Sequence, residues 1–128
     1  MGRIHQLLKV NGIDCQAAFD DGVRNSLICE LAATQSQPTT LQQARSVSIA
    51  GRRHELRRAC IVAAVIGETT FEFLAYLTDE IGLDDERQPI DVLIGSAAMR
   101  QWGIRFDIVQ SKLDFTHVSE SVVEFSAA

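Results

Sequence analysis

Residues 17–28 read AAFDDGVRNSLI, an apolar run that stops at an Asp-Asp-Gly turn and then gives way to a second apolar run. Aspartate and glycine favour turns, because the short carboxylate bonds to nearby backbone and glycine tolerates a positive φ. Later in the chain, residues 91–107 read DVLIGSAAMRQWGIRFD, in which an apolar strand pattern ends at Gly95. Both segments therefore predict a buried strand that ends at a glycine-containing turn.

Upstream of the first segment the sequence predicts a β-hairpin. Asn11-Gly12 lies between the apolar runs 7–10 and 13–19. This dipeptide suits a type I′ turn, whose two central residues both need a positive φ. The second strand of the hairpin would therefore end at Asp20.

The middle of the chain is rich in β-branched and aromatic residues and is broken by regular turn signals, which favours strands. Residues 26–33 fit a strand or a short helix, and the polar segment 34–41 reads as a loop. Periodicity alone cannot separate strand from helix in such short runs. The predicted strands here are residues 46–49, 59–66 and 69–77, with a turn at 50–53 and an acidic loop at 79–89.

The last third predicts a strand at 90–94, a short helix at 96–102 and two further strands at 104–109 and 112–115. Ser96 is available to cap the start of the helix, and Gly103 to end it. With 128 residues, the chain is one domain by size, residues 1–128. The prediction is an all-β domain with one short helix near its C-terminal end. Residues 119–128 fit either an interface strand or a loose tail.

Together, the two quoted segments resemble the retropepsin-like (retroviral-type) aspartic protease family. Residues 17–28 resemble the family's apolar strand, Asp-Thr/Ser-Gly turn and following Ser-x-Ile. Residues 91–107 resemble its later strand that ends in Gly, its short helix and its Gly-Ile turn. The resemblance covers roughly residues 7–115 and implies a closed acid-protease barrel.

The resemblance also implies a site and an activity. Asp20 would be the catalytic aspartate, within an active-site loop that includes Asp21, Gly22 and Val23. Aspartic proteolysis uses two carboxylates that share a proton, and this chain holds one Asp-x-Gly turn of that kind. The partner aspartate would then come from a second copy of the chain across a two-fold axis, so we expect a homodimer that cleaves peptide or protein substrates.

The resemblance further places a substrate groove next to this loop. A flap would close over the substrate near residues 50–56, with Gly51 at its bend and Arg52 beside it. Ile94 would belong to the apolar wall of the groove, and Gly95 would allow close backbone approach.

Asp21 departs from the family pattern, which has Thr or Ser at this position. A hydroxyl both donates and accepts a hydrogen bond, whereas an ionised carboxylate only accepts. Three alternatives follow: Asp21 is protonated in mild acid and mimics the hydroxyl, it points outward and loosens the dimer, or the domain is catalytically inactive and serves in dimerisation or peptide binding. A more distant alternative is an unrelated small β-barrel.

Composition narrows the remaining classes of function. The net charge of −5 argues against nucleic acid as a partner, and no apolar run is long enough to span a membrane. The N-terminus does not resemble a secretory signal, so we expect a cytoplasmic protein. Three cysteines without Cys-x-x-Cys spacing fit buried thiols, and no metal or organic cofactor is expected. No Ser or Cys lies in a nucleophile-elbow motif.

Overall fold

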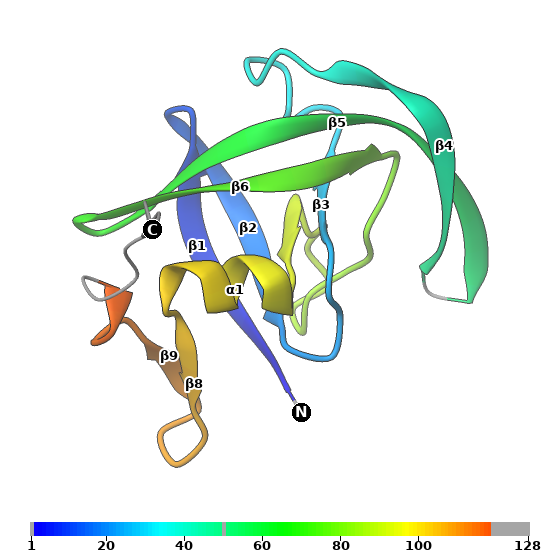
Figure 1. The fold of residues 1–128 in the computed structure, drawn as a ribbon. Coiled ribbons are helices and arrows are strands. Elements are labelled where there is room, and N and C mark those ends of the chain that lie inside the picture. Colours follow the sequence, from blue (N-terminus) through cyan, green and yellow to red (C-terminus); the bar gives the residue numbers. More distant parts are fainter. Residues whose placement is uncertain (1, 50, 119–128) are drawn as a thin grey trace, which may run out of the picture.

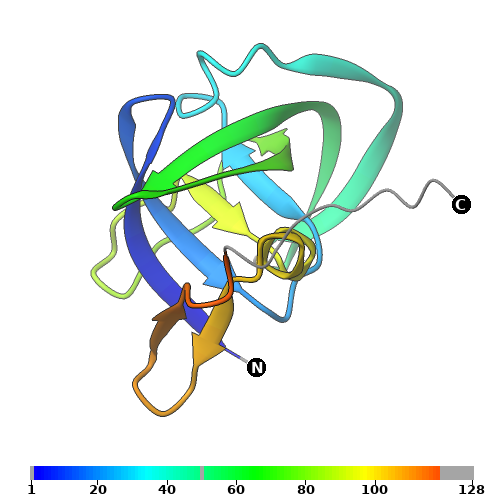
Figure 2. The same cartoon turned by 60° about the vertical axis from the view of Figure 1, so that its left-hand side comes forward.

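The computed structural model describes residues 2–49 and 51–118, which form strands and one short helix (Figures 1 and 2). The all-β prediction with a single short helix is confirmed for these residues. Residues 119–128, for which an interface strand or a tail was considered, lie outside the described residues. The elements in chain order are β1 (Arg3–Val10), β2 (Ile13–Asp20), β3 (Ser26–Cys29), β4 (Thr39–Ile49), β5 (Arg52–Ile66), β6 (Thr69–Thr78), β7 (Val92–Ile94), α1 (Ser96–Trp102), β8 (Arg105–Asp107) and β9 (Lys112–Asp114).

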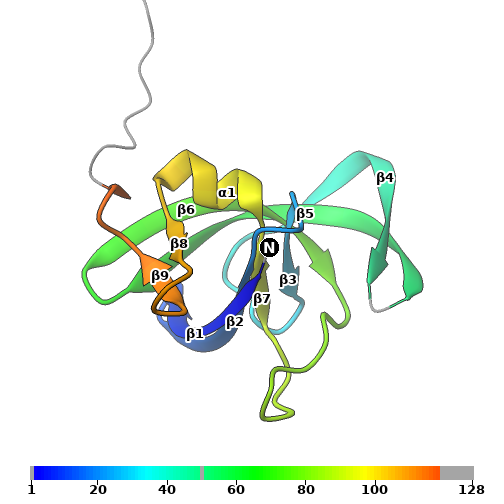
Figure 3. The ribbon, with the colours of Figure 1, turned by 90° about the horizontal axis from the view of Figure 1, so that it is seen from below.

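Seven strands form one sheet in the order β1-β2-β7-β3-β6-β5-β4. A further pairing joins β1 to β5, so six of these strands form a ring of hydrogen-bonded neighbours. β4 pairs only with β5 among the described strands and stands outside the ring, as Figure 3 shows. β8 and β9 form a separate hairpin below α1 in Figure 1.

The hairpin of β1 and β2 has the predicted turn. Asn11 has φ 50° and Gly12 has φ 83°, the two positive values that a type I′ turn requires. The turn sets an antiparallel register that runs from Val10 opposite Ile13 to Arg3 opposite Asp20. Side chains of the first and last residues of the hairpin are therefore brought together by the register itself.

β7 lies between β2 and β3 and joins the two quoted segments. It pairs with β2 in parallel, Phe19 opposite Ile94, and with β3 in the antiparallel sense. Asp91, just before β7, reinforces the junction, because its carboxylate accepts a hydrogen bond from the Gln16 backbone N–H at 2.8 Å. The parallel pairing carries the end of β2, and hence Asp20, to the start of α1.

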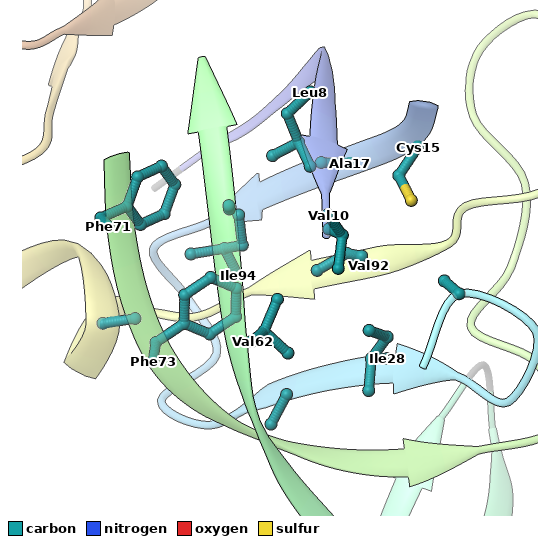
Figure 4. Close-up of a cluster of buried hydrophobic side chains, with 14 of the residues drawn as sticks. Leu8, Val10, Cys15, Ala17, Ile28, Val62, Phe71, Phe73, Val92 and Ile94 are labelled. Carbon is teal, nitrogen blue, oxygen red and sulfur yellow. The ribbon is translucent and has the colours of Figure 1, made fainter. Parts of the chain in front are cut away.

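Side chains on β2 and β7 alternate between two hydrophobic clusters. Phe19 and Ile94 enter the larger cluster. Figure 4 shows Ile94 in this cluster together with Phe71 and Phe73. The rings of Phe71 and Phe73 stack with their centroids 5.7 Å apart. The smaller cluster is packed on the other face of these strands, around Ala18, Leu27, Leu56, Ile81, Ile90 and Leu93.

The hairpin of β4 and β5 is longer than the sequence indicated. β4 begins at Thr39, inside the segment predicted as a loop, and β5 begins at Arg52, inside the predicted turn. The backbone of β4 forms its hydrogen bonds with β5. The side-chain pattern of β4 is mostly polar and does not indicate this pairing. The register shifts between Thr40 and Arg45, which marks a β-bulge.

The helix α1 has the predicted bounds, but its start is capped differently. Gly103 ends it in the left-handed region with φ 71°, as predicted. The prediction that Ser96 caps the start is wrong, because Gly95 is the N-cap and no side chain caps the helix. The first backbone N–H groups instead donate to the loop after β2, from Ser96 to Val23 O at 2.7 Å and from Ala97 to Arg24 O at 3.1 Å. These bonds satisfy donors that a side-chain cap would otherwise serve.

Gly95 lies against the backbone of the same loop. A Cβ built on Gly95 would stand 2.5 Å from Arg24 O and 2.6 Å from Asn25 O. Gly95 itself has extended backbone, so contact rather than φ demands glycine at this position.

We predict that Gly95→Ala destabilises the fold, because either Arg24 or the start of α1 must move to admit the methyl group. The cost should be about 1–3 kcal/mol or more, typical of overpacking. Urea unfolding measures it, with Gly2→Ala as the control, since a Cβ on Gly2 would meet nothing nearer than 3.7 Å. Equal stability of Gly95→Ala and the wild type would contradict this contact.

All three cysteines are free thiols, and two of them are buried. Burial, followed by the negative charge of Asp91, raises the pKa of Cys15 and of Cys29 to about 11. Burial also raises the pKa of Cys60. The thiols are therefore protonated at neutral pH, and the prediction of buried thiols holds for Cys15 and Cys60, while Cys29 is partly exposed.

We expect these thiols to react slowly in the folded protein. A pKa of about 11 leaves on the order of a thousandth of the thiol ionised at pH 8, and the thiolate is the reactive form. Absorbance during reaction with an aromatic disulfide should show a rate at least roughly a hundredfold below that of the urea-unfolded chain. Similar rates in both states would contradict the burial.

Candidate active site

Asp20 is the last residue of β2, where the strand leaves the ring and turns towards β3. Its Oδ1 accepts a hydrogen bond from the Gly22 backbone N–H at 2.9 Å. The side chain is 15% exposed. This short loop therefore holds the carboxylate in one orientation at the surface of the subunit.

Arg3 binds the other oxygen of Asp20. Its Nε and Nη2 donate to Asp20 Oδ2 at 3.1 Å and 2.9 Å. The two residues are directly opposite each other in the β1–β2 ladder, so the pair is a cross-strand ion pair. The Arg3 side chain is 40% exposed, which leaves part of the guanidinium in contact with solvent.

Asp21 is exposed and engages the N-terminal segment of its own chain. Its Oδ1 accepts from the Gly2 backbone N–H at 2.7 Å, and its own N–H donates to Gly2 O at 3.3 Å. A carboxylate needs no proton for this contact, because its partner is a backbone donor. In the subunit, the exposed Asp21 therefore lies beside Gly2 of the same chain.

The loop that follows Asp21 is held from several sides. Val23 donates its backbone N–H to Asp20 O, and its carbonyl accepts from Ser96. The buried hydroxyl of Ser26 accepts from the Gly95 backbone N–H at 3.0 Å. Gly95 packs on the carbonyls of Arg24 and Asn25. The two quoted segments thus form one hydrogen-bonded unit around Asp20.

Ile94 is not part of an accessible wall. It was predicted to line a substrate groove, but its side chain is fully buried in the larger cluster. Strand alternation explains the difference, because Ile94 shares a face with Phe19 and points into the ring. Leu93 has the opposite orientation and joins the smaller cluster.

Gly51 and Arg52 lie at the end of the long hairpin, with Gly51 at φ 77° in its bend. Ala50, which belongs to the predicted turn, is outside the described residues. Arg52 Nη1 lies 3.4 Å from Glu80 Oε1, on the chain that leaves β6. The hairpin side chains Val47 and Ile49 pack on the smaller cluster, as does Val23 of the Asp20 loop. The hairpin and the loop therefore share one apolar cluster.

A hollow of about 450 Å³ lies on the solvent side of Arg3. Figure 1 shows the elements around it, the N-terminal end of β1 and the β8–β9 hairpin, on the same side of the molecule. Three carboxylates line it, from Asp21, Asp85 and Asp107. His5 also lines it, and its Nδ1 is 3.7 Å from Asp85 Oδ2. Its Nε2 is buried and has no hydrogen-bond partner among residues 2–49 and 51–118.

Arg3 and Gly2, which bind Asp20 and Asp21 from the N-terminal strand side, were not predicted as site residues. A signal for Arg3 was present, since counting outward from the Asn11-Gly12 turn places it opposite Asp20. Gly2 carried no such signal, because its contact with Asp21 is made by backbone atoms.

Asp20 presents a partly exposed carboxylate at the end of β2, and backbone hydrogen bonds hold the loop that follows it. Among residues 2–49 and 51–118, no group of three or more His, Cys, Asp or Glu side chains could hold a metal ion. Within the same residues, no helix is long and apolar enough to cross a membrane. The chemistry available at Asp20 is proton transfer and hydrogen bonding by a carboxylate.

Comparison with known proteins identifies the fold. No protein-family model matches the sequence, and no curated protein matches it. Among solved structures, the retroviral protease-like domain of Ddi1 from Leishmania major is similar, with a TM-score of 0.65, 14% identity, and coverage of 92% of this chain and 91% of that chain. The protease of simian foamy virus (mac) gives a TM-score of 0.49 at 9% identity over 75% of this chain and 91% of its own. The likeness to the Ddi1 domain shows that the chain has a retropepsin-like fold.

Proposed function

We propose that this chain is an aspartic endopeptidase that works as a homodimer, with Asp20 of each copy forming the catalytic pair. The observation that supports this best is the placement of Asp20. Its carboxylate stands partly exposed at the end of β2, oriented by the Gly22 N–H and backed by the Gly95 contact, within a retropepsin-like fold. A single such aspartate in each chain makes a second copy necessary for a pair.

In the proposed reaction two Asp20 carboxyl groups share one proton, because two adjacent negative charges repel each other. The ionised group takes a proton from a water molecule, whose oxygen attacks the carbonyl carbon of the peptide bond. The protonated group gives its proton to the carbonyl oxygen. Collapse of the resulting tetrahedral intermediate, with protonation of the nitrogen, breaks the C–N bond and restores the shared proton.

The hairpin of β4 and β5 is the proposed flap. Its side chains Val47 and Ile49 pack on the cluster that also contains Val23, which supports a substrate position between the hairpin and the Asp20 loop. Gly51 at the bend and Arg52 next to it would then contact an extended peptide. The free thiols are compatible with a reducing compartment, which supports a cytoplasmic location for the proposed activity.

Replacing Asp20 by Asn should abolish cleavage, because an amide can neither take nor give the proton at neutral or acid pH. We expect the loss to be about a hundredfold to ten-thousandfold in kcat/KM, measured on a peptide library at several pH values. Asp14→Asn is the matched control, since Asp14 is an exposed aspartate on the same strand, paired with Lys9. Cleavage that survives Asp20→Asn would refute the assignment.

A second candidate function is a catalytically inactive domain that dimerises or binds peptides. The observation that favours it is the ion pair with Arg3, which occupies Asp20 Oδ2 in the subunit. Dimer formation and peptide binding without cleavage at any pH would support this candidate over the first.

Replacing Asp21 by Thr should strengthen the proposed dimer. Two copies that bring Asp20 together would also bring together their exposed Asp21 carboxylates, and like charges across an interface oppose association. Thr removes both charges and offers a hydroxyl that donates as well as accepts. Sedimentation at neutral pH should show association roughly tenfold tighter. Unchanged association would place Asp21 away from the interface, and weaker association would contradict the charge repulsion.

A further inference from the structure

We propose that Arg3 is a positioning residue that holds Asp20 in the free subunit and must release it before Asp20 can act. This inference rests on the proposed function and adds a residue and a control step to it. Arg3 would not contact the substrate. Its part is to decide when the Asp20 carboxylate becomes available.

The hydrogen bonds of Asp20 show why release is needed. Each carboxylate oxygen has two lone pairs. Both positions on Oδ2 are taken by Arg3 Nε and Nη2, and Oδ1 accepts from Gly22 N–H. While Arg3 stays in place, Oδ2 can neither carry the shared proton nor bind the water that attacks the peptide. Only the second lone pair of Oδ1 is then left for these two tasks, which need one acceptor position each.

The charge of Arg3 leads to the same conclusion. Two Asp20 carboxylates share a proton because their charges repel each other. If Arg3 stays bound to Asp20 in both subunits, each guanidinium compensates the negative charge of its carboxylate. The repulsion that makes the two carboxylates share a proton is then removed. A dimer with both Arg3–Asp20 pairs intact would therefore lack the proton donor that the proposed reaction requires.

The backbone holds Arg3 in position while leaving its side chain room to move. The β1–β2 register places Arg3 opposite Asp20, and the two backbone contacts between Gly2 and Asp21 continue the pairing beyond it. The Arg3 side chain itself is 40% exposed. Release consequently needs rotation of one side chain and no movement of the strand.

The hollow beside Arg3 offers the released guanidinium other partners. It is lined by Asp21, Asp85 and Asp107 as well as by Arg3. Asp85 is 95% exposed, and Asp107 Oδ1 accepts from the Gln110 backbone N–H. Arg3 can therefore exchange Asp20 for another carboxylate, which gives its side chain a second arrangement.

The first test is kinetic. In Arg3→Met the cation is lost while most of the side-chain length is kept, and kcat/KM should rise about threefold to tenfold. Arg3→Lys, which keeps the charge without the two-pronged contact, should fall between Arg3→Met and the wild type. Lys9→Met is the matched control, because it removes a cation from the same strand and breaks the exposed Lys9–Asp14 pair.

The salt dependence of activity separates a positioning role of Arg3 from a purely structural one, because a structural role would leave it unchanged. Because the Arg3–Asp20 pair is partly exposed, raising the salt from about 0.05 M to about 0.5 M should screen it. Wild-type and Lys9→Met activity should then rise, while Arg3→Met should respond less. Activity of Arg3→Met that equals the wild type at every salt concentration would overturn the proposal, and so would a folded Arg3→Met that is less active.

A second test does not depend on cleavage. A double-mutant cycle of Arg3→Met and Asp20→Asn, followed by urea unfolding, should show a coupling of about 1.5-fold to 5-fold in the unfolding equilibrium constant. No coupling would overturn the proposal even if the wild type cleaves peptides. Coupling without cleavage by any variant would overturn the proposed function and the release step, while establishing the pair itself.

Discussion

The register of the β1–β2 hairpin is the constraint on which the rest of this structure depends. It is set by the Asn11-Gly12 turn, whose two positive φ angles pair the strands without slippage. A shift of one residue would turn Phe19 away from the core and move Asp20 from its position opposite Arg3. The same register sends Ala18 to the smaller cluster and Phe19 to the larger one, so packing and site geometry follow from one turn.

The second constraint is the close contact between the loop after β2 and the start of α1. The carbonyls of Val23 and Arg24 accept the first N–H groups of the helix, and Gly95 alone leaves room for this approach. A residue with a Cβ would separate the two segments. Backbone contacts with the start of α1 thus hold the Asp20 loop in place. The side chains of Asp20 and Asp21 are not used in these contacts and make polar contacts of their own.

Both aspartates are satisfied within one subunit. Asp20 binds Arg3 and Gly22, and Asp21 binds Gly2. The repulsion between the two adjacent carboxylates is therefore offset within the subunit, by the Arg3 guanidinium at Asp20 and by the backbone N–H groups of Gly22 and Gly2. These contacts leave neither carboxylate without a partner inside the subunit, and in the proposed mechanism the contact of Asp20 with Arg3 is exchanged for another. The ion pair thus links the stability of the subunit to its proposed activity.

The sequence by itself determined the features that depend on local chemistry. The type I′ turn, the bounds of α1, its glycine end and the all-β class all followed from turn residues and from strand-forming composition. The position of Asp20 at the end of a strand followed as well. Only the tertiary structure decided which face each side chain occupies and which distant groups satisfy each polar atom. Ile94 enters the core because β7 pairs with β2, β4 begins early because β5 lies beside it, and Arg3 binds Asp20 because two strand ends meet. Each of these outcomes depends on strand pairing. The pairing of Arg3 with Asp20 follows from the register of a local hairpin, whereas the pairing of β7 with β2 joins segments far apart in the chain, which local sequence patterns do not encode.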